Sequence, residues 1–388
     1  MRILHISTHD ENCGIGKYQE MYIAAMHSVN SKVINDFFAT SPNVMRQQTK
    51  VEFQATMEKL SAELMGYDLV HIQHEFSFYG KGQLAEIVRR IKLAGKPFVS
   101  TIHTRPVINT VTSSRLSPKW PIRKVRTEIG NRRYADLVLP LAESKLVIVH
   151  NTSTRQVLTE LGFDKHRIMI KPIPVPKPNR PSSDFTKQIE DIKNKVHYKP
   201  GDFIFATVGY LSQVKGCMQI IKTPSLLPPH YKLLIFGGIH PLGKNDETLD
   251  EMSDYIVDHN LQDRVFISGF VEDDDLLNAY ASSVDLLVFP YMREYASSSA
   301  ALNNGFASEK PILAFPLDTF KEVEVEGKHA MTFCESFSYY DLAKSIQSFT
   351  PTKIKEASAI SRQYKETFSY SILAAELIKL YAKLLVVS

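Results

Sequence analysis

The chain has 388 residues, too long for one ordinary hydrophobic core, and its 44% hydrophobic and 23% charged residues exclude a disordered protein. Its 46 basic and 42 acidic residues leave a net charge of only +4, which argues against nucleic acid as a partner. The cysteines Cys13, Cys217 and Cys334 lie far apart, so we expect no disulfide framework and a reducing, cytoplasmic location.

Short apolar strands alternate with helical patterns through the first half of the chain. This alternation predicts a parallel sheet covered by helices on both faces. We assign residues 1–175 to this first domain. The expected strands are 3–6, 33–38, 69–72, 98–102, 146–149 and 168–170, and the expected helices are 17–27, 84–93 and 153–161.

Five prolines between Lys171 and Ser183 favour extended chain, and we expect a linker over 176–186. The alternation then resumes and predicts a second α/β domain over 187–365. The final segment, 366–388, carries an amphipathic helix, which we expect to pack back on the first domain. In the second domain the expected strands are 203–208, 233–236, 265–267, 286–289 and 312–314, and the expected helices are one starting near 215, then 249–259, 275–282 and 299–308.

Three motifs could hold an anion. Gly14-Ile15-Gly16 follows the first expected strand at the start of a helix, although Gln19 breaks the dinucleotide-binding pattern and a tight turn alone is the alternative interpretation of the glycines. Lys215 follows a strand that ends at Gly209, where it could neutralise a diphosphate. A serine run before Asn304 opens a later helix, where Ser297 or Ser298 would serve as the N-cap or the hydroxyls would cradle a phosphate.

Taken together, the motifs resemble the retaining glycosyltransferase family 4, which has the GT-B fold. Their order and spacing carry the resemblance over nearly the whole chain. It implies two Rossmann-like α/β domains facing across a cleft, and transfer of a sugar from a UDP- or GDP-sugar to a glycan, lipid-linked or other hydroxyl acceptor. The matching segments are 14–18, 70–76, 237–241, 263–265, 269–271 and 297–311.

The resemblance also implies roles for particular residues. It makes His103 and Lys215 catalytic, and it places the nucleobase near Gly269-Phe270-Val271. The donor-binding residues implied are Gly14, Gly16, Tyr210, Lys215, His240, Phe270, Val271, Glu294, Ser297, Ser298, Ser299 and Asn304. The residues after the 69–72 and 98–102 strands are acceptor-binding candidates, namely Gln73, His74, Glu75 and Arg105.

The chain departs from the family pattern at two donor-binding positions where the family carries a charged side chain. Tyr210 stands where the family usually has arginine, and Asn304 stands where it has a glutamate that binds the donor ribose. A first acidic position is either lost at Ala296 or shifted to Glu294, and Arg293 is an alternative cation. These departures keep open a catalytically reduced sugar-nucleotide-binding protein, and the shared architecture keeps open a sugar-nucleotide epimerase.

Two charged segments have competing interpretations. Asp273-Asp274-Asp275 could suggest a metal site, but acids directly before Leu276 favour a helix cap, so we expect a metal-independent reaction without a cofactor. The basic segment 115–133 is either an ordinary surface helix or a peripheral contact with anionic lipid at the inner membrane face. Flotation with anionic and neutral vesicles would separate these two interpretations.

Overall fold

The computed structural model describes residues 1–9, 13–40, 45–106, 136–239, 248–293 and 299–387. The described chain forms two compact units. It leaves the first unit after Pro172 and returns to it at Tyr370, so the last helix belongs to the first unit. Within the second unit the outgoing and returning segments pair, since the Val175 N–H donates to Phe368 O at 2.8 Å.

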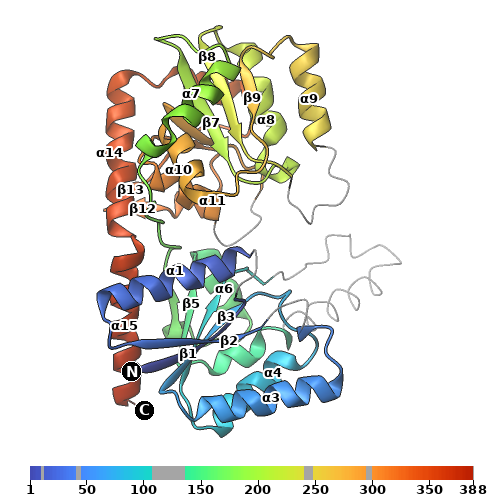
Figure 1. Ribbon diagram of the computed structural model, residues 1–388, viewed down its shortest axis with the longest axis vertical. Helices are drawn as coiled ribbons and strands as arrows, with labels where there is room; N and C mark the ends of the chain where they lie inside the picture. Colours follow the sequence, from blue (N-terminus) through green and yellow to red (C-terminus); the bar gives the residue numbers. More distant parts are fainter. Residues whose placement is uncertain (10–12, 41–44, 107–135, 240–247, 294–298, 388) are drawn as a thin grey trace, which may run out of the picture. The chain divides into compact units, whose positions relative to one another are not determined.

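The first unit is built on a six-stranded sheet in the order β2-β1-β3-β4-β5-β6, and every neighbouring pair is parallel. Figure 1 labels strands β1, β2, β3 and β5 of this sheet. Parallel strands need crossover connections, and helices supply them here. The strands are β1 (Arg2–Ser7), β2 (Ile34–Ala39), β3 (Leu69–His74), β4 (Phe98–Ile102), β5 (Leu146–Val149) and β6 (Ile168–Ile170).

The two faces of this sheet differ in chemistry. Leu4 and Ile6 alternate with His5 along β1, and Val70 and Ile72 alternate with His71 along β3, so one face is apolar and the other carries polar side chains. The apolar face joins one core with α3 (Lys50–Leu64) and α4 (Gln83–Leu93). The polar face is covered by α1 (Gly14–Val29) and α15 (Tyr370–Val387), which pack against each other.

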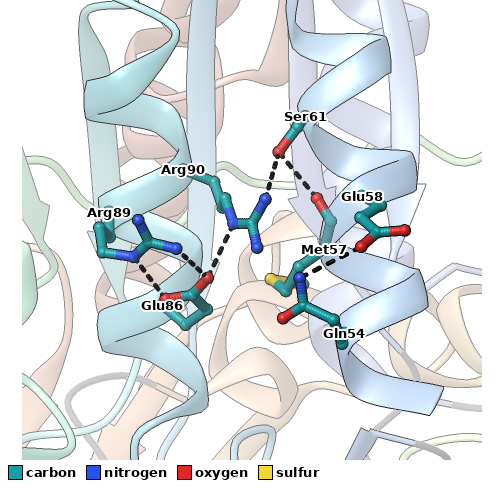
Figure 2. A network of polar contacts seen from close by, with 7 residues as sticks. All are labelled: Gln54, Met57, Glu58, Ser61, Glu86, Arg89 and Arg90. Atoms are coloured by element: carbon teal, nitrogen blue, oxygen red, sulfur yellow. Dashed lines mark hydrogen bonds and ion pairs between the residues drawn. The ribbon is translucent and has the colours of Figure 1, made fainter. Parts of the chain in front are cut away.

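Helices α3 and α4 are also linked by polar contacts (Figure 2). Arg90 donates to Glu86 on its own helix and, at 3.3 Å, to Ser61 Oγ on α3. Arg89 pairs with the same Glu86, and the two arginines hold the pKa of that carboxyl near 2. The network thus adds one polar link between the two helices that cover the apolar face.

The second unit has a parallel six-stranded sheet in the order β14-β11-β10-β7-β8-β9. Both of its faces are apolar, because alternate residues of the strands enter two different hydrophobic cores. The strands are β7 (Phe203–Val208), β8 (Tyr231–Phe236), β9 (Val265–Ile267), β10 (Leu286–Phe289), β11 (Ile312–Ala314) and β14 (Thr332–Phe333), with a separate hairpin of β12 (Glu324–Val325) and β13 (Lys328–His329).

Helices cover each face of the second sheet. One core includes side chains of α7 (Thr186–Lys195), α10 (Asp274–Ser282), α11 (Ala300–Ala307) and α14 (Pro351–Thr367). The other includes side chains of α8 (Cys217–Lys222), α9 (Thr248–Asp258) and α13 (Tyr339–Gln347). The remaining described helices are α6 (Thr152–Glu160), α12 (Asp318–Lys321) and the 3-10 turns η1 (Leu139–Glu143), η2 (Lys165–Arg167), η3 (Ser182–Phe185), η4 (Gln213–Lys215) and η5 (Thr223–Leu226).

The two parallel sheets confirm the predicted α/β fold with two domains of similar architecture. The expected linker region lies in the second unit, where Arg180 pairs with Asp273 and, at 3.3 Å, with Asp275. The Asp273 carboxylate accepts from the Asp275 and Leu276 N–H groups at 2.9 and 3.2 Å, which confirms the helix-cap interpretation of this acidic run. Among the helices that the structure describes, none combines the length and apolar character needed to cross a membrane.

Candidate functional site

Four glycines shape the carboxyl edge of the second sheet. An added Cβ at Gly237 would lie 1.9 Å from Gly209 O, and one at Gly238 would lie 2.9 Å from the Phe270 nitrogen. Gly216 has φ +72°, and a Cβ there would lie 1.8 Å from Pro290 O. Backbones therefore approach more closely here than side chains would allow. This tight edge is what holds the η4 turn and its last residue, Lys215, over the end of β7.

Replacing Gly216 by alanine is expected to destabilise the second unit by several kcal/mol, because the Cβ would collide with Pro290 O and φ is positive. Gly327 is a matched control, since it has the same φ of +72° and no atom within 4 Å of an added Cβ. Its alanine variant should lose only about 1–2 kcal/mol. Urea unfolding of both variants measures the difference, and equal losses would show that the close approach at Gly216 does not matter.

The ammonium group of Lys215 lies among aromatic rings. Its Nζ is 5.9 Å from the centre of the Tyr210 ring and 5.7 Å from that of Tyr291. Within the described parts of the chain no carboxylate pairs with it, and burial lowers the pKa of the amine from its ordinary value. The ring faces offer weak attraction, about 0.5–2 kcal/mol each, which replaces little of the lost hydration. A partly buried ammonium group that has lost hydration and has no carboxylate partner among the described residues attracts an anion.

The start of α11 lies beside the same lysine. A Cβ at Gly209 would lie 2.9 Å from Ala301 Cβ, in the first turn of α11, and 3.4 Å from Lys215 Nζ. Ser299 caps the helix, its Oγ accepting from the Leu302 N–H at 3.2 Å, and the Tyr291 hydroxyl lies 3.1 Å from that oxygen. The N–H groups of a helix start and its dipole favour negative charge. Lys215 and α11 therefore provide two adjacent sources of positive potential.

An aromatic pair lies next to this positive edge. The rings of Tyr210 and Phe270 stack with their centres 5.4 Å apart and their planes within 2° of parallel. Phe270 is 44% exposed, so its ring can also contact a ligand. Val271 and Asn304, on the neighbouring loop and on α11, are partly buried. The expected donor-binding residues Lys215, Tyr210 and Phe270 thus gather at one edge of this sheet.

In the first unit, His103 directly follows β4 and belongs to the polar face of the sheet. Its Nε2 lies 2.8 Å from Gln73 Oε1, and its Nδ1 lies 3.1 Å from His150 Nε2. His150 Nδ1 in turn lies 2.9 Å from Lys171 O. The edge of the Tyr18 ring approaches the His103 ring at 4.9 Å between centres. The imidazole is therefore held on several sides.

The same chain of contacts continues under α1 and α15. Gln73 is bonded to Gln19, whose amide nitrogen lies 2.8 Å from His5 Nδ1. His71 lies 2.5 Å from the Tyr381 hydroxyl through Nδ1 and 2.8 Å from Thr101 Oγ1 through Nε2. These side chains are almost wholly buried. Hydrogen bonds inside the unit thus replace the water that they lose on folding.

Burial keeps His5, His71, His103 and His150 neutral. It lowers the pKa of His5 and His150 to about 4, and it lowers the pKa of His103 and His71 well below the usual range. Neighbouring histidines lower the pKa of His103 further. The dominant cause is the loss of hydration, which penalises the charged form of an imidazole.

The acceptor-binding candidates separate into two groups. β3 extends to His74, two residues beyond the expected strand, because Gln73 and His74 pair with Thr101 and Ile102 on β4. Neither Gln73 nor His74 exposes any side-chain surface, so in this structure they support the site from beneath. Glu75 and Arg105 are partly exposed, and they bond Thr104 and, at 2.7 Å, Ser153 Oγ.

Other expected site residues differ from the sequence prediction in their helix position, or lie outside the residues that the structure describes. α1 begins at Gly14, three residues before the expected start at Lys17, so Gly14 and Gly16 lie in its first turn, at the start of a helix as the sequence predicted. The cap of α11 is Ser299, whereas Ser297 or Ser298 was the sequence-based choice. The described residues do not include His240, Glu294, Ser297, Ser298 or the basic segment 115–133.

Sequence reasoning missed the partners that hold the two candidate catalytic side chains. Tyr291 comes directly after Pro290 and gave no signal in the sequence. His5 and His71 did give one, because each lies inside an apolar strand and alternates with a further polar residue, Ser7 or Gln73. The period-two pattern of polar residues in these strands therefore predicts His5 and His71 on one face, whereas His150 follows a strand of apolar residues and gave no such signal.

Solved structures with the same architecture extend over nearly the whole chain. HepE from Anabaena, solved with UDP, has a TM-score of 0.69 at 14% identity, with 99% of this chain and 100% of that chain covered. Sucrose-phosphate synthase from Thermosynechococcus elongatus has a TM-score of 0.68 at 17% identity, with 100% of both covered. A glycosyltransferase from Rickettsia africae has a TM-score of 0.69 at 13% identity, with 99% and 98% covered. Likeness at such identities shows the fold, and the chain has the GT-B fold of glycosyltransferases.

The sequence of the second unit gives a separate match. Residues 188–366 match the family described as glycosyl transferases group 1. This span contains Lys215, the Tyr210–Phe270 pair and α11. A search of curated proteins found no match.

Proposed function

We propose that the chain is a retaining, metal-independent glycosyltransferase of the family 4 type that uses a UDP- or GDP-sugar. The observation that carries this proposal is the Lys215 ammonium, which lies beside the start of α11 and has no carboxylate partner among the described residues. A diphosphate would satisfy both the cation and the helix N–H groups. The donor-binding half would then be the second unit.

The comparisons support the same choice of ligand. The span that matches the glycosyl transferases group 1 family includes every described element of this positive edge. Similar structures were solved with UDP, with UDP and glucose, and with UDP-glucose. The Tyr210–Phe270 pair offers an aromatic surface on which the planar base of such a nucleotide would stack.

The proposed reaction needs charge stabilisation and no resident metal. The bond between the anomeric carbon and the diphosphate oxygen breaks with its electron pair on that oxygen, where Lys215 and the α11 dipole stabilise the charge. The acceptor hydroxyl bonds to the same face of the carbon, and its proton passes to the departing diphosphate. The products are a glycoside of unchanged anomeric configuration and a nucleoside diphosphate. His103 would line the sugar side, and Glu75 and Arg105 the acceptor side.

A donor screen tests the proposal. UDP and GDP are compared by thermal shift, and the sugar nucleotides of the stabilising base are then incubated with hydroxyl acceptors, with and without EDTA. Free nucleoside diphosphate with a glycoside of retained configuration supports the proposal. Interconversion of two sugar nucleotides would instead identify an epimerase. Activity that EDTA abolishes and Mg²⁺ or Mn²⁺ restores would refute metal independence.

A catalytically reduced binding protein is the second candidate, because Tyr210 and Asn304 replace the charges that the resemblance implies. Changing Tyr210 to arginine would place a second cation near Lys215, and we expect it to tighten UDP binding by about tenfold, the scale of one added charge-assisted hydrogen bond. Tyr210→Phe is the control, since it keeps the stack on Phe270 without adding charge. Calorimetry measures both variants. Tighter binding without turnover in either form would favour the reduced protein.

A further inference from the structure

The hydrogen-bond chain through His103 ends at an atom that can only accept a hydrogen bond. Lys171 O is a carbonyl oxygen and can only accept, so the proton of a neutral His150 is on Nδ1. His150 Nε2 is then an acceptor, and the contact of 3.1 Å requires His103 to donate from its own Nδ1. A neutral His103 consequently has a lone pair on Nε2. The low pKa of both imidazoles supports this neutral arrangement.

The Gln73 amide decides what meets that lone pair. With Oε1 facing His103 Nε2, the two imidazoles would need three protons between them, one more than two neutral rings carry. With the amide turned over, its NH₂ donates to His103 Nε2 and its oxygen faces Gln19. Turned in the same sense, Gln19 accepts from His5 Nδ1–H, and Asn35 donates to His5 Nε2. Each link from Lys171 O to His5 then has one donor and one acceptor, and the heavy-atom distances are unchanged. The Gln73 oxygen also accepts from His71 Nε2, 3.3 Å away, and turning Asn35 gives up only its 3.4 Å contact with Val33 O.

We infer that Gln73 is a positioning residue whose side-chain amide donates to His103 Nε2 and, together with His150, holds that ring as a neutral imidazole protonated on Nδ1. Both ring nitrogens of His103 are thus engaged inside the first unit. The ring therefore neither takes nor gives a proton during turnover, and it acts as a fixed wall of the site. This consequence for catalysis rests on the proposed function, whereas the protonation of the ring does not.

Long-range proton–nitrogen NMR of the full chain with ¹⁵N-labelled histidine tests the inference directly. The His103 signals are identified by their absence in His103→Gln. In the unsubstituted chain at pH 7 we expect protonated Nδ1 and unprotonated Nε2. A ring protonated on Nε2, or on both nitrogens, would overturn the inference whatever the activity of the protein.

Variants then separate a positioning role from simple support of the fold. Gln73→Leu removes the donor and should shift the Nε2 resonance downfield, with Nδ1 still protonated through His150. Gln73→Glu supplies an acceptor and should bring a proton to Nε2. The matched control is Gln83→Leu, because Gln83 is a buried glutamine of the same unit that donates to Met45 O at 2.6 Å, away from this chain. An Nε2 resonance that moves equally in Gln83→Leu, or not at all in Gln73→Leu, would also overturn the inference.

Turnover measured on the same samples distinguishes the two proposals. A chain that shows the Nδ1–H signature but transfers no sugar refutes the proposed function and leaves the inference standing. A chain that transfers sugar with His103 protonated on Nε2 refutes the inference alone.

Discussion

Replacing Lys215 by methionine is expected to lower sugar transfer by about 100-fold or more and to weaken UDP binding by about 10- to 100-fold. Methionine keeps most of the apolar stem and removes the charge that the diphosphate would meet. The same substitution should leave the unfolding temperature unchanged or raise it, because the ammonium is desolvated without a carboxylate partner among the described residues. Function and stability are therefore expected to move in opposite directions.

Lys222 provides the matched control for this experiment. It lies on α8, seven positions beyond Lys215, and its Nζ is 5.7 Å from the centre of the Tyr339 ring. The two lysines thus make similar ring contacts, but only Lys215 lies at the start of α11. Calorimetry with UDP and a turnover assay compare Lys215→Met with Lys222→Met. Equal binding by both variants would remove Lys215 from the donor site.

Acidification is expected to destabilise the first unit much more than the second. Burial lowers the folded-state pKa of His5, His74 and His150 to about 4, while the unfolded value is about 6.5. Below pH 6.5 these histidines bind protons in the unfolded chain but stay neutral in the folded unit. The free energy of unfolding therefore falls with pH until about pH 4, where the folded histidines also become protonated. At pH 5 the loss is about 2 kcal/mol for each such histidine.

The second unit lacks this source of acid sensitivity, since all four of its described histidines are exposed. Urea unfolding at pH 7 and pH 5, with protein footprinting to follow each unit, measures the difference. His74→Gln should lessen the loss at pH 5, because glutamine can still donate to Leu137 O, which His74 Nε2 contacts at 2.8 Å. His230→Gln is the exposed control. A loss shared equally by the two units would contradict the expectation.

The strand pattern was readable from the sequence because most expected strands are short, mainly apolar runs, and the structure has a strand at each of them, whereas β12, β13 and β14 were not expected. Helix α3 was missed, although Thr49 and Glu52 form a capping box at its start, a signal that can be found in the sequence alone. The helix buries only a narrow stripe of Met57, Leu60 and Leu64, so its apolar pattern is weak.

The candidate site was readable only in part. A lysine before a helix is visible in a sequence, but its desolvation depends on Tyr210 and Tyr291, which reach it from different segments. The positions of Gln73 and His74 depended on where β3 ends, and pairing with β4 decided that end. Contacts between distant segments therefore determine what local patterns leave open.

The return of the chain to the first unit has a consequence for biosynthesis. The buried Tyr381 hydroxyl contacts His71, and Glu376 pairs with Lys171. His71 and Lys171 are synthesised early and therefore gain these partners only after the C-terminal helix has been synthesised. While the ribosome is still adding the second unit, the polar face of the first sheet has α1 but no α15 above it, so part of this face stays open to water. The early sheet can collapse on its α3–α4 side, but its other side is finished only after translation passes residue 381. Chaperone contact with the nascent protein should therefore persist until that point.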